Sequence, residues 1–157
     1  MPFCAAANTT ARTVLNKLEG MHMSFNLGVW YPHERLTNTQ AGELYVGLCE
    51  GTADGPPPHP AVEAFYEELT TQHPELDDVP ANRLGDHEYS PWSCEIDHLP
   101  GHVIMASVWP KADYVDNLVK ELARKHGLAV FDPQSERITY PDGSLGVDDE
   151  KPWWKFW

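Results

Sequence analysis

The chain has 157 residues, of which 41% are hydrophobic, and its 11 basic and 24 acidic side chains give a formal charge of −13 at pH 7. This length suits one domain with a core of its own, and the hydrophobic fraction is higher than that of disordered chains. The negative charge makes nucleic acid and anionic membranes poor partners, and no apolar run is long enough to span a bilayer.

The sequence divides into one predicted domain and two terminal segments. Residues 1–22 have little apolar periodicity, and we interpret them as an N-terminal extension or a start that is not part of the natural protein. Residues 23–141 hold the predicted strands and helices and are expected to form a single α/β domain. Residues 142–157 combine acidic residues with three tryptophans and a phenylalanine, and form a separate acidic, Trp-rich tail.

The first half of the domain is predicted to contain a strand followed by two helices. Phe25, Leu27 and Val29 alternate with polar or small residues, which is the two-residue period of a strand with one buried face. Both helices have apolar residues spaced three and four apart, as one buried helical face requires. These elements are expected over residues 24–31, 37–50 and 60–73.

A long polar connection over residues 75–91 separates these elements from the second half of the domain. Loops of this length within a compact domain are often functional or disordered. A Pro-Gly turn at 100–101 joins two predicted strands, and apolar residues at helical spacing between Val115 and Leu122 predict the clearest helix of the chain. The elements expected here are strands over 92–97, 102–109, 128–131 and 137–140, and a helix over 110–126.

The predicted order of elements is β, α, α, β, β, α, β, β, which is close to a split βαββαβ arrangement. We therefore predict an α+β fold with a two-layer, ferredoxin-like antiparallel sheet and an extra helix in the first crossover. The helices are expected on one face of the sheet, which leaves the other face open or covered by the tail.

The negative charge is concentrated in one stretch of the chain. Eleven acidic residues and a single base, Arg83, lie between Asp54 and Asp97, so this stretch carries −10 of the total −13. Complementary charge speeds association with a basic protein, whereas the alternative interpretation is a solvated face that keeps the protein soluble. Tyr and Trp are frequent in interface hot spots. The residues predicted to bind such a partner are Asp77, Asp78, Asp86, Glu88, Tyr89 and Trp92.

Eight histidines raise a second hypothesis, a metal site. His98 and His102 flank the turn between two predicted strands, and Asp97 is next to the first of them. Zinc sites need three or four converging ligands, and the sequence has no HExxH, CxxC or HxH pattern, so solvated histidines are the simpler interpretation. We predict no cofactor. The alternative is a small metal-dependent enzyme or ligand-binding protein that uses Asp97, His98 and His102.

Cysteine usage bears on the cellular compartment. Cys4, Cys49 and Cys94 are odd in number and form no CxxC pair. A disulfide framework is therefore not expected, and a cytoplasmic location is the default.

Four segments of the domain are distinctive: MSFNLGVWYP at 23–32, SPW at 90–92, the apolar strand that ends at Trp109, and RKHGLAVFDPQSERITYP at 124–141. Together they resemble a group of small, largely uncharacterised bacterial proteins that are similar to immunity partners of polymorphic toxins. The most specific part of the resemblance is HGLAVFDPQ at 126–134. It implies an immunity function and supplies no catalytic residues. From the residues themselves, we expect Asp132 and Pro133 to form an Asx-type turn.

These observations favour a binding function over catalysis. The leading hypothesis is an acidic, immunity-like protein that binds a basic partner, a cognate toxin, and occludes its active surface. Acidic side chains would pair with Lys and Arg of the toxin, and Tyr89 and Trp92 would anchor the contact. The metal-dependent alternative and a housekeeping structural partner remain as further hypotheses.

Overall fold

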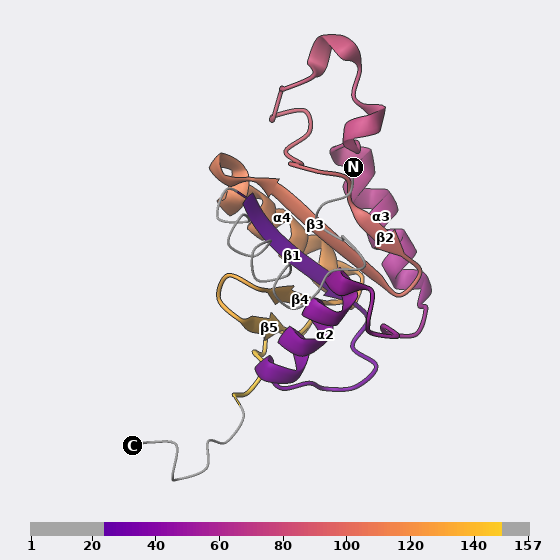
Figure 1. Cartoon of the computed structure of the whole chain (residues 1–157), viewed down its shortest axis with the longest axis vertical. Helices are drawn as coiled ribbons and strands as arrows, with labels where there is room; N and C mark the ends of the chain where they lie inside the picture. The colour runs from indigo at the N-terminus through magenta and orange to yellow at the C-terminus, as the bar shows by residue number, and fades with distance from the viewer. Residues whose placement is uncertain (1–23, 149–157) are drawn as a thin grey trace.

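The computed structural model describes residues 24–148, which form an α+β fold around a five-stranded, fully antiparallel sheet (Figure 1). The strands lie in the order β2-β3-β1-β4-β5. They are β1 (Ser24–Trp30), β2 (Asp97–Leu99), β3 (His102–Val108), β4 (Ala129–Asp132) and β5 (Arg137–Thr139). The helices are α2 (Asn38–Glu50), α3 (Pro60–Gln72) and α4 (Ala112–Lys125).

The predicted α+β class and the antiparallel sheet are confirmed, and both α2 and α3 lie between β1 and β2 in the chain. The predicted extension over 1–22 and most of the predicted tail lie outside the described residues. Within the described range, no helix has the length and apolar character that crossing a membrane requires.

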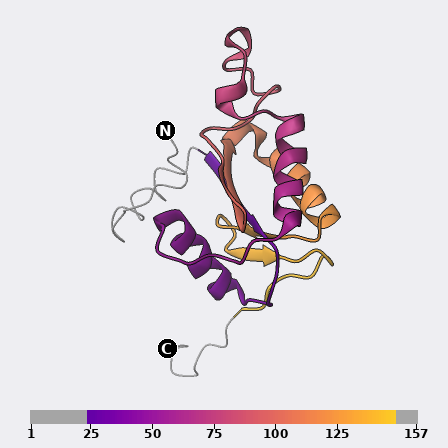
Figure 2. The same cartoon turned by 90° about the vertical axis from the view of Figure 1, so that its right-hand side faces the viewer.

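Helices cover both faces of the sheet, which corrects the prediction that they share one face (Figure 2). On one face, Leu27 of β1 lies in a buried cluster with Phe65 of α3 and Val119 of α4. On the opposite face, Tyr45 of α2 packs against Phe131 of β4, with ring centres 5.4 Å apart. The physical reason is that β1 and β3 are buried along nearly their whole length, so both of their faces need cover.

The sequence explains where α2 begins and ends and how close it approaches the sheet. Thr37 and Gln40 form a capping box, in which each side chain accepts a hydrogen bond from the other residue's backbone N–H, at 3.1 and 2.9 Å. Gly51 ends the helix in the left-handed conformation, at φ 73°. At the contact with the sheet, a Cβ on Gly28 would lie 2.9 Å from the ring of Tyr45, so only glycine leaves room for this ring.

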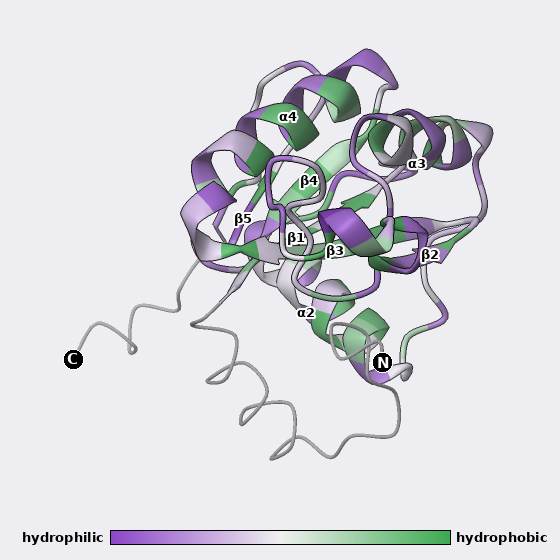
Figure 3. Cartoon of the chain, turned by 90° about the horizontal axis from the view of Figure 1, so that it is seen from above, coloured by the Kyte–Doolittle hydropathy of each residue, from purple (hydrophilic) through white to green (hydrophobic). Residues whose placement is uncertain are grey.

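The second half of the domain differs from expectation in one strand. The segment predicted as a strand over 92–97 is mostly irregular: Trp92 makes a single bridge to Ser107, and β2 begins only at Asp97. Helix α4 follows a short 3-10 helix, η5 (Trp109–Lys111), and buries Val115 and Val119 against the sheet. Hydrophobic and hydrophilic residues alternate along α4 as its amphipathic pattern requires (Figure 3).

The Asp-Pro-Gln segment after β4 has a structural role, and the predicted Asx-type turn is confirmed. Oδ1 of Asp132 accepts hydrogen bonds from the backbone N–H groups of Gln134 (2.8 Å) and Ser135 (3.3 Å). The Gln134 amide then pairs with the main chain of Asn26, accepting from its N–H at 2.9 Å and donating to its carbonyl at 2.8 Å. Strand β4 pairs only with Gly28–Trp30, so the edge of β1 at Asn26 has no strand beside it on this side. The Gln134 side chain takes the place of a neighbouring strand there.

Candidate functional site

The candidate site is the acidic loop, which we define as residues 74–91 between α3 and the Trp92 bridge. It projects from the body of the domain beyond the end of the sheet (Figures 1 and 2). The loop contains two short 3-10 helices, η3 (Leu76–Asp78) and η4 (Ala81–Arg83). It carries five acidic residues and one base, Arg83.

Buried and partly buried hydrogen bonds hold the two ends of the acidic loop together. Ser90 Oγ donates to the carbonyl of Pro74 (2.8 Å), and Trp92 Nε1 donates to the carbonyl of His73 (3.0 Å). His73 Nδ1 donates to the carbonyl of Tyr89 (3.0 Å), which leaves Nε2 to accept from the Tyr114 hydroxyl (2.7 Å). The base of the loop is therefore a fixed part of the domain, fastened to both α3 and α4.

Glu75 belongs to this framework and not to the exposed surface. Its Oε1 accepts from the backbone N–H of Ile96 (2.9 Å), and its Oε2 accepts a short hydrogen bond from the Tyr66 hydroxyl. Burial and this hydrogen bond raise the pKa of Tyr66 well above its ordinary value. Tyr66 therefore stays a neutral donor throughout the physiological pH range.

Asp77 and Asp78 lie exposed on η3, and neither makes an ion pair within residues 24–148. Asp86 pairs with Arg83 at 2.9 Å. Desolvation opposes ionisation of Asp86, but hydrogen bonds from the Glu88 backbone and the Arg83 side chain outweigh it and lower its pKa. Glu88 pairs with Lys111, yet its side chain remains 80% exposed.

The two predicted aromatic anchors differ in burial. Tyr89 is half-buried at the surface, and the guanidinium of Arg83 lies 4.5 Å from the centre of its ring. Trp92 is only 2% exposed and belongs to the main core cluster. Its predicted role as a partner-binding anchor is therefore corrected: Trp92 fills space between the loop and the sheet and donates its N–H to His73.

Two further aromatic residues at the base of the acidic loop were not among the predicted anchors. Trp109 and Tyr114 are 51% and 47% exposed. Lys111 lies between them in the chain, pairs with Glu88, and has its ammonium 5.9 Å from the centre of the Tyr114 ring. Tyr114 immediately precedes Val115, the first residue of the apolar stripe that α4 buries. Adjacent helical residues point in different directions, so the sequence did indicate that Tyr114 lies outside this stripe.

The −10 stretch carries less free negative charge than the sequence indicates. Six of its eleven acidic side chains contact a basic, histidine or other hydrogen-bonding partner. They are Glu63, Glu68, Glu75, Asp86, Glu88 and Asp97. Asp77 and Asp78 are therefore the clearest unengaged carboxylates of the acidic loop.

Asp97, His98 and His102 do not form the metal site considered from the sequence. His102 Nε2 lies 3.2 Å from Oδ2 of Asp97, on the α2 side of the sheet. His98 points to the other side, where it stacks on Tyr66 at 3.7 Å between ring centres and lies 2.8 Å from Glu63. Successive strand residues face opposite ways, so the three groups cannot converge. Within residues 24–148, no cluster of three His, Cys, Asp or Glu side chains is arranged to hold a metal.

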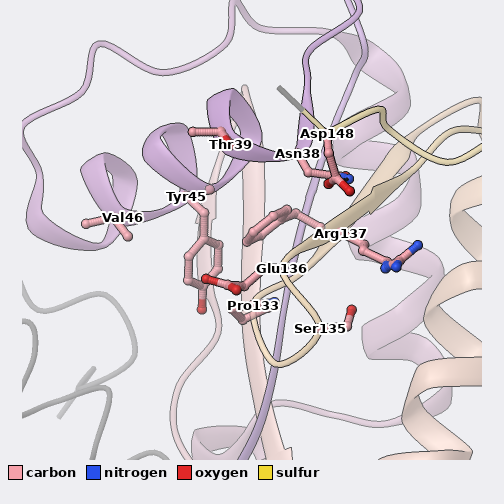
Figure 4. Close-up of a pocket in the computed structure, with 11 residues that line it drawn as sticks. Asn38, Thr39, Tyr45, Val46, Pro133, Ser135, Glu136, Arg137 and Asp148 are labelled. Atoms are coloured by element: carbon pink, nitrogen blue, oxygen red, sulfur yellow. Dashed lines mark hydrogen bonds between the residues drawn. The ribbon is translucent and has the colours of Figure 1, made fainter. Parts of the chain in front are cut away.

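Apart from the projecting loop, the described residues form a groove of about 490 Å³ between α2 and the β4–β5 hairpin (Figure 4). Tyr45 contributes to its wall from α2, and Glu136 and Arg137 from the hairpin. Asn38, at one end, accepts a hydrogen bond from a β5 backbone N–H (3.0 Å) and donates to the Asp148 carboxylate (2.8 Å). The amide of Asn38 therefore fastens the end of the described chain to α2 and β5.

Comparison of the chain with protein-family models, curated proteins and solved structures gives no match. The function is therefore argued from the acidic loop alone.

Proposed function

We propose that the protein binds a basic protein partner through the acidic loop, as an immunity-like inhibitor that occludes the active surface of a cognate toxin in the cytoplasm. One observation carries the proposal. Exposed carboxylates of Asp77, Asp78 and Glu88 lie on a projecting loop whose ends are held by buried and partly buried hydrogen bonds.

The fastened base of the loop supports this proposal in energetic terms. A loop that is already ordered loses little conformational entropy when it binds, so more of the contact energy appears as affinity. A projection also suits occlusion, because it can enter a cleft lined with Lys and Arg. Tyr89 and the exposed Trp109 and Tyr114 supply the aromatic contacts that Trp92 cannot supply.

We also propose a finer description of the fold, a ferredoxin-like split βαββαβ sheet with β5 added at one edge. The order β2-β3-β1-β4 supports it, because α4 connects β3 to β4 across β1.

Co-expression with the product of the adjacent gene tests the immunity proposal. We expect this protein to restore the growth of cells that produce the neighbouring protein, and the two proteins to purify together. Failure of both growth rescue and co-purification would reject the proposal.

A matched pair of variants tests the proposed surface. The triple variant Asp77→Asn/Asp78→Asn/Glu88→Gln removes three charges from the loop, and Glu43→Gln/Glu121→Gln/Glu136→Gln removes three exposed charges elsewhere. We expect the loop variant to associate about tenfold more slowly with the captured partner at low salt, and the control to change the rate much less. Equal effects of the two variants would show that the loop is not the contact.

A further inference from the structure

Two cations of the protein itself, Arg83 within the acidic loop and Lys111 in η5, are each held between a carboxylate and an aromatic ring. Arg83 lies 2.9 Å from Asp86 and 4.5 Å from the centre of the Tyr89 ring. Lys111 pairs with Glu88 and lies 5.9 Å from the centre of the Tyr114 ring. The surface therefore contains two cation positions, each formed by a carboxylate and an aromatic ring.

Both cation positions can be reached from solvent through their carboxylates. The side chains of Arg83 and Asp86 are 44% and 36% exposed. Lys111 is only 23% exposed, but its partner Glu88 is 80% exposed. The neighbouring Trp109 and Tyr114 rings are about half exposed. An incoming cationic side chain can therefore reach these carboxylates and rings without disturbing the core.

We propose that Arg83 and Lys111 occupy the two positions that arginine side chains of the partner take in the complex. This inference rests on the proposed function and names what the surface recognises: a segment with several arginines. Arginine fits best, because a planar guanidinium stacks on a ring and pairs with a carboxylate at the same time. The internal cations act as stand-ins that the partner displaces.

Displacement is feasible because exposed ion pairs are weak. Such a pair contributes little to stability, so a partner that supplies two guanidinium groups at once replaces both internal contacts at small cost. A ligand with one cation gains less, since the second internal cation still repels it. Removing the internal cations should therefore strengthen binding.

The test uses a blocked hexa-arginine peptide as the probe, at low salt, with the full chain and isothermal titration calorimetry. We expect Arg83→Gln/Lys111→Gln to bind the peptide roughly threefold to tenfold more tightly than the unmodified protein. The charge-matched control is Lys120→Gln/Lys125→Gln, which removes two cations from ion pairs further along α4. A second variant, Lys111→Met, removes the charge but keeps an apolar side chain against Tyr114. Circular dichroism establishes that each variant is folded.

Tighter binding by the Arg83/Lys111 variant than by the control supports the inference, and equal or weaker binding overturns it. A hexa-lysine peptide should gain less from the same substitutions, and an equal gain would reject the preference for arginine. The loop variant Asp77→Asn/Asp78→Asn/Glu88→Gln distinguishes a failure of the proposed binding surface from a failure of the role given to Arg83 and Lys111. If it binds hexa-arginine as the unmodified protein does, the proposed surface fails. If it loses binding while the Arg83/Lys111 variant matches its control, only the stand-in role fails.

Discussion

At the scale of single residues, burial separates the tryptophans that support the fold from those that are available for binding. Trp92 lies in the core and donates a hydrogen bond across the base of the acidic loop. Trp109 packs one edge against Phe25, with ring centres 6.1 Å apart, and keeps about half of its surface in solvent. The sequence contains both as apolar residues near strands, so only their packing distinguishes them.

Replacing each tryptophan with alanine should therefore have different costs. We expect Trp92→Ala to lower the free energy of unfolding by about 3–5 kcal/mol, because it leaves a cavity and an unpaired carbonyl. Trp109→Ala should cost much less, because half of the side chain is already hydrated. Urea denaturation of both variants measures the difference, and similar costs would contradict the assignment of Trp92 to the core.

At the scale of elements, the contact between α2 and the sheet depends on the absence of a side chain on β1. The Tyr45 ring lies over Gly28, where an added Cβ would be 2.9 Å from a ring carbon. Gly42, on α2 itself, is different, because its added Cβ would meet the Phe131 ring at an ordinary 3.5 Å. Of two glycines at the same interface, Gly42 therefore has room for an added methyl group and Gly28 does not.

We predict that Gly28→Ala destabilises the protein by about 1–3 kcal/mol, because the Tyr45 ring must move within a packed layer. Gly42→Ala should instead stabilise it by about 0.5–1 kcal/mol, because alanine favours the helix and the space is free. Thermal denaturation followed by circular dichroism compares the two. A stabilised Gly28→Ala variant would show that α2 does not pack on β1 as described.

The second element-scale feature is the Gln134 side chain on the edge of β1. It makes two hydrogen bonds with the main chain of Asn26, in place of a neighbouring strand. We predict that Gln134→Ala lowers the free energy of unfolding by about 1–3 kcal/mol, because both Asn26 backbone groups lose their partner. Gln40→Ala, which removes half of a capping box, is a control of similar chemistry with an expected cost of about 0.5–2 kcal/mol. Hydrogen exchange should show faster exchange at Asn26 only in the Gln134 variant.

At the scale of the whole molecule, the high net charge is partly offset by pairs between distant segments. Glu68 of α3 accepts hydrogen bonds from Lys125 Nζ (2.9 Å) and His126 Nε2 (2.8 Å) at the end of α4. These contacts lower the pKa of Glu68, mainly through the hydrogen bond from Lys125 and then through that from His126. The pairing stabilises the packing of α3 beside α4 on one face of the sheet.

The lowered pKa of Glu68 has a definite consequence for stability at acid pH. Because the folded-state pKa lies below that of the unfolded chain, the stabilisation is complete above the unfolded value and is lost as the pH falls through the folded value. We expect Glu68→Gln to be less stable than the unmodified protein at pH 7, and the difference to vanish at the acid end of a urea-denaturation series. Glu67→Gln, one residue away and without an ion pair in the described residues, is the control. A difference that does not change with pH would contradict the role of the Glu68 charge.

The sequence alone determined most of the elements and one local turn of this protein. Apolar periodicity located the three helices and the strands other than β2, which lies after the segment predicted as a strand over 92–97. Asp132 with Pro133 predicted the turn after β4, because such a turn depends on residues close together in the chain. Tertiary structure decided which face α2 covers, which tryptophans are buried, and which acidic residues keep their charge unengaged. The reason is that periodicity identifies an apolar face but not the element that packs on it. The ion-pair partners are also distant, since Glu88 meets Lys111 and Glu68 meets Lys125 only after the chain has folded.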